Sequence, residues 1–432
     1  MGRSISERKE LANSYRKKGD FAEALPLYES LWQETADPFV GTGLLCCYRK
    51  SRLFDKAIPL AEELCKEHTG LTWAAREICW TLVQGKLQMF DESTPLEEVI
   101  KIADTVLKCS PDFLAKKLAV FKVLKWAKKK DDWDTIESWV DRIEPASLST
   151  EPMHFGSGRE GWSDLCLWYN YKINLLLKKE AFGEAREKAV IADEKCLKQR
   201  LFFLRLQAQA MVGLGEMETA QNLYEELCNK RRPEWWLLHE YGNLLKEKGE
   251  IDKALLVLCM AALSNRKLEM MVKLFSDIAE IFLKKGESEK ARAHCYLEKF
   301  VRDDNGWPIS SSLAASIDRL DSKMLGNSAP LSRQEAFSIC RTFWNGICGT
   351  DTSETRTKKK DLVGQLTIPK NKPFCFMNTK DGLSAICFSK DMPDDVANGD
   401  TVIFDVISSF DKKKNRESWK ATKIRRFNVK KD

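Results

Sequence analysis

The fold is decided by residues 201–264, which read LFFLRLQAQAMVGLGEMETAQNLYEELCNKRRPEWWLLHEYGNLLKEKGEIDKALLVLCMAALS. The stretch repeats at a spacing of 34 residues, with the same residue character at matching positions. The matched pairs are Leu204 with Leu238, Ala208 with Gly242, Met211 with Leu245, Gly215 with Gly249, and Ala220 with Ala254. Each unit is predicted to be two short amphipathic helices joined by a tight turn.

Glycine suits the turn because it enters the left-handed backbone region without a Cβ penalty. The small residues of the repeat fall where the two helices of a unit must cross closely. A unit of this size cannot bury its apolar face alone, so neighbouring units are expected to stack into a solenoid. The period, the turn glycine and the small-residue positions resemble those of the tetratricopeptide repeat family.

Similar units are predicted along most of the chain, about eight helical pairs in all. The predicted parts are N-terminal repeats at 5–145, an exposed loop at 146–162, further repeats at 163–300, a helical cap at 301–348 and a linker at 349–360. In the second unit Ser51-Arg52 replaces the turn glycine. The fold class is therefore mostly α.

After residue 360 the pattern changes from helical to alternating. Five strand-like runs at 362–368, 373–378, 384–388, 401–407 and 419–425 are separated by turn signals such as Asp381-Gly382. Five short strands in about 70 residues are typical of a small oligonucleotide-binding (OB) barrel, predicted at 361–428.

The barrel resembles a cold-shock domain, through the stretches 364–367, 372–377, 385–388, 399–406 and 419–424. Residues two apart on a strand share one face, so Phe374 and Phe376 are expected to project together beside Phe388. Bases stack on such a platform. Ile368 and Ile386 stand where the family usually has aromatic residues, which leaves open a barrel that binds protein.

Basic residues of the barrel are predicted to hold phosphates. These residues are Lys370, Lys372, Lys423, Arg425 and Arg426. From residue 356 to the end, 18 Lys and Arg stand against 10 Asp and Glu, whereas the first 355 residues carry a net charge of −2. The asymmetry points to a polyanionic partner at the C-terminal end.

The repeats are expected to form a groove for a protein partner. The predicted groove residues are Lys9, Asn13, Arg205, Trp236, His239 and Asn243. Lys9 and Asn13 occupy positions that chaperone-binding members of the family use to grip a terminal carboxylate. Gly43, however, stands where that subfamily has asparagine, so a solvated helix face is the alternative.

No membrane-length apolar run occurs, and a cytoplasmic protein is expected. The 14 cysteines include no Cys-x-x-Cys pair and are expected to be buried reduced thiols. No metal site, cofactor or small-molecule substrate is predicted. The string GSGREG at 156–161 matches G-x-G-x-x-G but follows a loop instead of a strand, so no dinucleotide site and no enzyme is expected.

Together these features predict a non-enzymatic adaptor, in which the repeats bind a protein and the barrel binds single-stranded RNA or DNA. One alternative is a pure protein-interaction scaffold. Another is a regulatory accessory subunit of a nucleic-acid-directed effector, as in bacterial defence, which rests on analogy alone.

Overall fold

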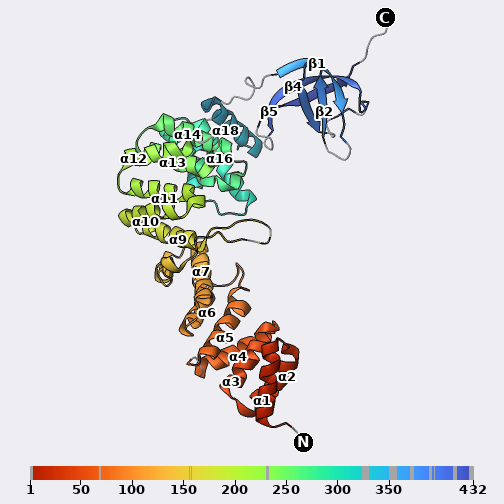
Figure 1. The fold of residues 1–432 in the computed structure, drawn as a ribbon. Helices are drawn as coiled ribbons and strands as arrows, with labels where there is room; N and C mark the ends of the chain where they lie inside the picture. The colour runs from red at the N-terminus through yellow and green to blue at the C-terminus, as the bar shows by residue number, and fades with distance from the viewer. Residues whose placement is uncertain are drawn as a thin grey trace. The chain divides into compact units, whose positions relative to one another are not determined.

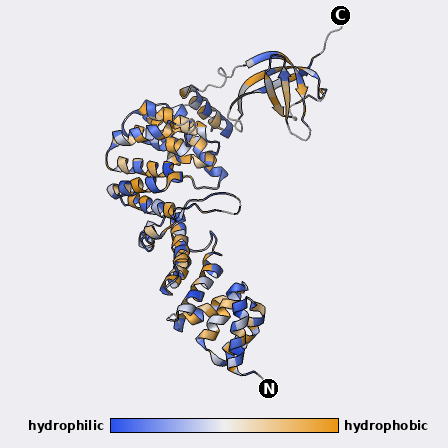
Figure 2. Ribbon diagram, viewed as in Figure 1, coloured by the Kyte–Doolittle hydropathy of each residue, from blue (hydrophilic) through white to orange (hydrophobic). Residues whose placement is uncertain are grey.

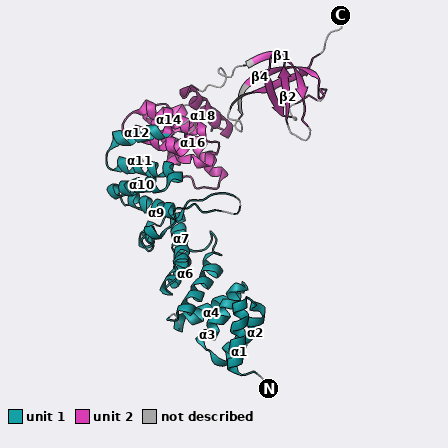
Figure 3. Cartoon of the chain, viewed as in Figure 1, with its two compact units in different colours: residues 1–227 teal, residues 228–432 magenta. Residues whose placement is uncertain are grey.

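The computed structural model describes residues 3–67, 70–154, 156, 158–229, 233–323, 330–349, 358–369, 374–388, 392–393, 395–411 and 416–427. The chain divides into two compact units, Met1–Leu227 and Cys228–Asp432 (Figure 3). Among the described residues, no helix combines the length and the apolar character needed to cross a membrane.

The first unit is a succession of antiparallel helices (Figure 1). They are α1 (Ile5–Lys18), α2 (Phe21–Thr35), α3 (Pro38–Lys50), α4 (Phe54–Glu67), α5 (Thr72–Leu82), α6 (Leu96–Lys108), α7 (Phe113–Lys129), α8 (Trp133–Val140), α9 (Asp164–Lys178), α10 (Phe182–Lys195), α11 (Arg200–Gly213) and α12 (Met217–Cys228). A π-helical turn, η1 (Val83–Leu87), extends α5, and η2 (Pro145–Ser147) and η3 (Leu197–Gln199) are 3-10 turns.

The second unit begins with further helices and ends in a β-barrel. Its helices are α13 (Trp235–Glu247), α14 (Ile251–Ser264), the 3-10 turn η4 (Leu268–Met270), α15 (Val272–Lys285), α16 (Ser288–Asp304), α17 (Ser311–Lys323) and α18 (Arg333–Ile347). The helices α17 and α18 lie within the predicted cap. In Figure 2 the helices of both units carry apolar and polar residues, as amphipathic helices do.

The repeat turns adopt the conformation that the sequence predicts. Gly215 and Gly249 have φ angles of +79° and +80°, in the left-handed region. In the turn of the second repeat, where Ser51-Arg52 stands in place of glycine, Arg52 takes a φ of +59°. The helix end is therefore made in the same way there, at the cost that a side chain adds in this region.

The small residues lie where helices cross. Ala208, Ala220 and Ala254 have no exposed surface. A Cβ atom on Gly242 would lie 2.5 Å from Leu258 Cδ2, so glycine is needed for α13 to approach α14. These contacts confirm the helix-crossing role predicted for the repeat's small positions.

The barrel is closed, with strand order β1-β2-β3-β5-β4. Its strands are β1 (Lys358–Thr367), β2 (Phe374–Thr379), β3 (Ser384–Phe388), β4 (Thr401–Asp411) and β5 (Arg416–Arg426). All neighbouring pairs are antiparallel except β3 and β5. The core includes Met377, Cys387 and Phe404, none more than 1% exposed. The fold is thus a helical solenoid followed by an OB-like barrel, as predicted, although β1 begins inside the predicted linker.

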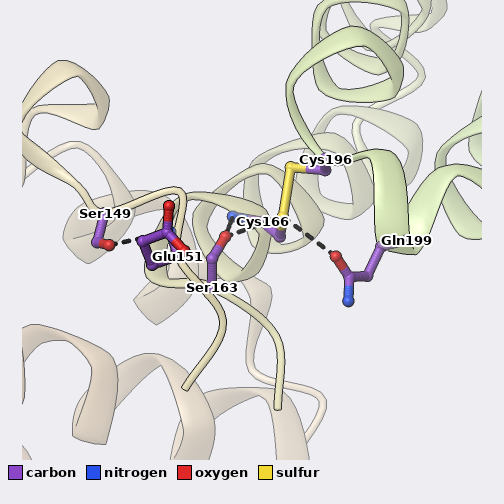
Figure 4. The surroundings of a disulfide bond; sticks show 6 residues. All are labelled: Ser149, Glu151, Ser163, Cys166, Cys196 and Gln199. Atoms are coloured by element: carbon purple, nitrogen blue, oxygen red, sulfur yellow. Dashed lines mark hydrogen bonds between the residues drawn. A yellow bond between two sulfur atoms is a disulfide. The ribbon is translucent and has the colours of Figure 1, made fainter. Parts of the chain in front are cut away.

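The expectation that the cysteines are reduced thiols is wrong for one pair. Cys166, in the first turn of α9, forms a disulfide with Cys196 at the end of α10 (Figure 4). The antiparallel packing of the two helices brings their Cα atoms to 5.8 Å, within disulfide reach. The separation of 30 residues in the sequence does not predict this bond, because only the packing of α9 on α10 brings the two cysteines together.

The G-x-G-x-x-G string lies in the loop between α8 and α9. His154 and Glu160 form an isolated β-bridge there, and Gly158 has a φ of +72°. Helices flank the loop on both sides. Its surroundings are therefore not the strand, turn and helix of a dinucleotide site.

Candidate nucleic-acid interface

Two strands of the barrel bring the predicted aromatic residues together. Phe374 lies directly opposite Phe388 across the β2–β3 ladder, and Phe376 lies opposite Ile386. Cys375 points into the core between the two β2 phenylalanines. The rings of Phe374 and Phe376 are 5.6 Å apart and nearly perpendicular. The predicted common face is therefore present.

This face is accessible to solvent. Phe388 is 45% exposed, while Phe374 and Phe376 are half-buried. None of the three belongs to the buried barrel core. Ile368, just after β1, is 37% exposed. The arrangement presents one open ring and two partly open rings to a ligand.

Lys420 adds a cation that sequence reasoning did not select. Its strand, β5, runs parallel to β3, and Lys420 pairs with Ile386. Its ammonium group lies 5.8 Å from the centroid of the Phe388 ring. The only sequence signal was the alternation around Trp419-Lys420. Lys420 lies beside the aromatic residues only because β5 pairs with β3, and this pairing depends on barrel closure. We call Phe374, Phe376, Phe388 and Lys420 the aromatic face.

The predicted phosphate-binding residues of β5 have carboxylate partners on β1, on β4 and just before β4. Arg425 pairs with Ile403 of β4 and forms an ion pair with Asp361 of β1, on the β5–β4–β1 wall. The side chain of Lys423 is 80% exposed, with its ammonium 3.7 Å from Asp405. Arg426 lies 3.6 Å from Asp400. Exposed pairs of this kind contribute about 0–1 kcal/mol, so they leave the cations available.

Lys370 and Lys372 lie outside the described residues. The contacts of Lys423, Arg425 and Arg426 described above are with carboxylates of the chain itself, so the phosphate-binding role of all five basic residues stays a prediction.

The groove residues predicted on α13 connect it to the next repeat. His239 Nε2 lies 2.7 Å from Asp277 Oδ2 of α15, and Asn243 Nδ2 donates to the same oxygen at 3.3 Å. Lys246 and Lys273 lie 3.4 and 3.2 Å from the other oxygen. Asp277 is 3% exposed.

These contacts decide the charge of Asp277. Burial alone would raise the pKa of its carboxyl group. The hydrogen bond from His239 and the charges of Lys246 and Lys273 outweigh burial and lower the pKa to about 2. Asp277 is therefore ionised at neutral pH and holds α13 against α15.

The groove residues predicted in the first repeat are also engaged within the chain. Lys9 Nζ lies 2.6 Å from Asp37, the N-cap of α3. Asn13 Oδ1 accepts a hydrogen bond from the Tyr28 hydroxyl at 2.9 Å. A Cβ atom on Gly43 would lie 2.5 Å from the Tyr28 ring. An asparagine there would displace Tyr28, which explains why this element of the carboxylate grip is missing.

The other two predicted groove residues are half-buried. Arg205 lies on α11 and Trp236 on α13. The charge of Arg205 acts on Lys128 of α7, which places the two cations near each other. The partner-binding role of all six groove residues stays a prediction.

Comparisons with protein families give two matches. Residues 203–320 match a Domain of unknown function (DUF7017), and residues 9–38 match a tetratricopeptide repeat. No curated protein matches the sequence. The repeat match and the helical pairs described above together define a tetratricopeptide-type solenoid that carries a C-terminal barrel.

Similar solved structures include two with a tetratricopeptide name. A tetratricopeptide repeat protein from Parabacteroides merdae ATCC 43184 is 14% identical, with 63% of this chain and 98% of that chain covered and a TM-score of 0.29. The TPR2AB domain of yeast Sti1 in complex with pHSP90 is 13% identical, covering 65% and 97%, at 0.24. A human IFIT1 dimer with PPP-AAAA is 12% identical, covering 80% and 79%, at 0.37.

Proposed function

We propose that the protein is a non-enzymatic adaptor whose repeats bind a protein partner and whose barrel binds single-stranded RNA or DNA. The observation that carries the proposal is the aromatic face, with Phe388 open to solvent and Lys420 beside its ring. A base stacked on an aromatic ring contributes about 1–3 kcal/mol and is tolerant of sequence. Lys420 supplies a charge for the adjoining phosphate.

The adaptor acts through effective concentration. Once the repeats hold their partner, nucleic acid bound to the barrel of the same chain meets that partner intramolecularly. Neither contact needs to be tight on its own. This suits a face that offers one open ring and two partly covered ones.

The test is fluorescence anisotropy of labelled single-stranded RNA and DNA with the full chain, across a salt series. Phe388→Ala removes the open ring, and the expected loss of affinity is about 5- to 150-fold, the equivalent of one stacked base. Phe427→Ala is the matched control, because Phe427 is also exposed, at 38%, but follows β5 and is not part of the aromatic face. Equal affinities for the two variants would contradict the proposal.

A protein-interaction scaffold is the second candidate. It is favoured by Ile368 and Ile386, which replace aromatic side chains with aliphatic ones beside the phenylalanines. Salt separates the two functions, because binding through phosphates weakens steeply as salt rises. An affinity for protein at the aromatic face that is insensitive to salt would favour the scaffold.

A further inference from the structure

The helix α7 is unusually basic. Residues 113–130 contain seven lysines and no Asp or Glu. Part of this charge is compensated by neighbouring elements, since Lys117 pairs with Asp164 and Lys129 with Glu92. Four of the lysines, Lys129 among them, lie in two groups around tryptophan rings.

The first group surrounds Trp126. The ammonium groups of Lys122, Lys125 and Lys129 lie 4.1, 5.6 and 5.6 Å from the ring centroid. Burial, followed by the charges of Lys125 and Lys129, lowers the pKa of Lys122. Trp126 itself is only 5% exposed, so it supports the lysines and offers little surface to a base.

The second group joins three successive helical pairs. Lys128 of α7 and Lys178 of α9 lie 4.5 and 5.7 Å from the centroid of the Trp133 ring. Burial lowers the pKa of Lys128, the charge of Asp131 raises it, and Arg205 of α11 and Lys178 lower it further. Three cations from three helices therefore act on one another.

The packing of α7 on α9 fixes this second group. Lys117 contacts Asp164 at 2.6 Å near the N-terminal ends of the two helices, and the rings of Phe121 and Tyr171 lie 6.5 Å apart further along. Lys128 and Lys178 are at the C-terminal ends, where no ion pair to a carboxylate is found for either within the described part of the chain. The fold thus holds like charges close together.

We propose that this surface binds the phosphate backbone of a single-stranded nucleic acid, as a second site separate from the barrel. The α7 basic surface consists of Lys122, Lys125, Lys128, Lys129, Lys178 and Arg205. Mutual repulsion of these cations is relieved when a row of negative charges binds and releases its counterions.

The chemistry of the surface favours phosphates over an acidic peptide. Lys122 and Lys129 are seven residues apart, which spreads the charge over about 10 Å of helix. A row of point charges suits a row of phosphates, because lysine binds phosphate as a point charge.

The test uses the full chain carrying Phe388→Ala, so that the barrel contributes little. In this background, Lys125, Lys128 and Lys178 are changed together to Gln, and binding of labelled single-stranded RNA and DNA is followed across a salt series. The matched control changes three exposed lysines of α4 and α6 to Gln, namely Lys66, Lys101 and Lys108. Circular dichroism melts confirm that both variants are folded.

The expected result is weaker binding and a smaller salt dependence for the α7 variant alone. Each phosphate contact contributes about 0.7 to the slope of log K against log salt for a single strand, so three lost contacts lower the slope by about 2. Equal slopes for the α7 variant and the control overturn the proposal. So does an α7 variant that loses binding to polyglutamate but keeps its nucleic-acid binding, which would assign the surface to an acidic protein segment.

The two proposals fail in different ways. If the barrel does not bind nucleic acid, Phe388→Ala has no effect in the otherwise unchanged chain. If the α7 basic surface does not bind it, the lysine changes have no more effect than the control in either background.

Discussion

We predict that acid loosens the packing of the last described helix, α18, through one histidine. His294 of α16 is completely buried, and the indole N–H of Trp344 in α18 donates to His294 Nε2 at 2.9 Å. The other ring nitrogen, Nδ1, lies 2.7 Å from the carbonyl oxygen of Lys290, so it carries the proton and donates. The imidazole is neutral, because a proton on Nε2 would face the Trp344 N–H.

The magnitude follows from the pKa of His294. Burial lowers it from 6.5 to about 4, although the Lys290 carbonyl raises it slightly. Since the folded pKa is below the unfolded one, this stabilisation is fully present above pH 6.5 and is lost as pH falls towards 4. The total contribution of this pKa shift to the free energy of unfolding is about 3 kcal/mol, of which about 2 kcal/mol is lost by pH 5.

Native-state hydrogen exchange of amides in α16 and α18 measures the free energy of opening this region. It is compared at pH 7.5 and pH 5 for the chain and for the His294→Gln variant, which cannot titrate. The variant is expected to be less stable at pH 7.5, with the difference shrinking by about 2 kcal/mol at pH 5. A difference that does not change with pH would refute the reasoning, since other titrating groups affect both proteins alike.

Three further predictions follow from single contacts. Gly249→Ala should destabilise the protein by about 1–2 kcal/mol in thermal melts, because the φ of Gly249 is +80°. Gly183→Ala, in the first turn of α10, is the control and should not destabilise it. An added Cβ atom would meet nothing within 4 Å at either position, so the two changes differ in backbone conformation. Asp277→Asn should cost about 3 kcal/mol in chemical denaturation, because the ammonium groups of Lys246 and Lys273 then face one another without that carboxylate. Glu280→Gln removes a half-exposed partner of Lys246 and should cost under about 1 kcal/mol. Mass spectrometry after alkylation should find the α9–α10 disulfide, and its removal should cost about 3–4 kcal/mol. Full alkylation without reduction would exclude that bond.

The sequence predicts those features that depend on local backbone and on periodicity. The left-handed turns at Gly215 and Gly249 follow from the 34-residue spacing, and the five strands follow from alternation. Contacts between elements distant in sequence could not be predicted in this way. Lys420 reaches Phe388 only because β5 pairs in parallel with β3, and Cys166 reaches Cys196 only through helix packing.

Polar side chains on the first helix of several repeat pairs connect that helix to the next pair. At four of the junctions, a Lys, Arg or His side chain on the first helix of one pair contacts a carboxylate at the start of, or within, the first helix of the next pair. The pairs are Lys9 with Asp37, Arg49 with Glu77, Lys117 with Asp164, and His239 with Asp277. The residue types differ at each junction, so the 34-residue pattern conceals a contact that recurs in space.

This recurring contact has a consequence for ligand binding. Cations that are already paired across a junction can bind a partner only by giving up a partly buried carboxylate, which is costly. The α7–α9 junction has such a pair at one end, Lys117 with Asp164, and has Lys128 and Lys178 at the other. A polyanion can bind those two lysines without breaking a junction, which is why we assign the second site to this end of the helices.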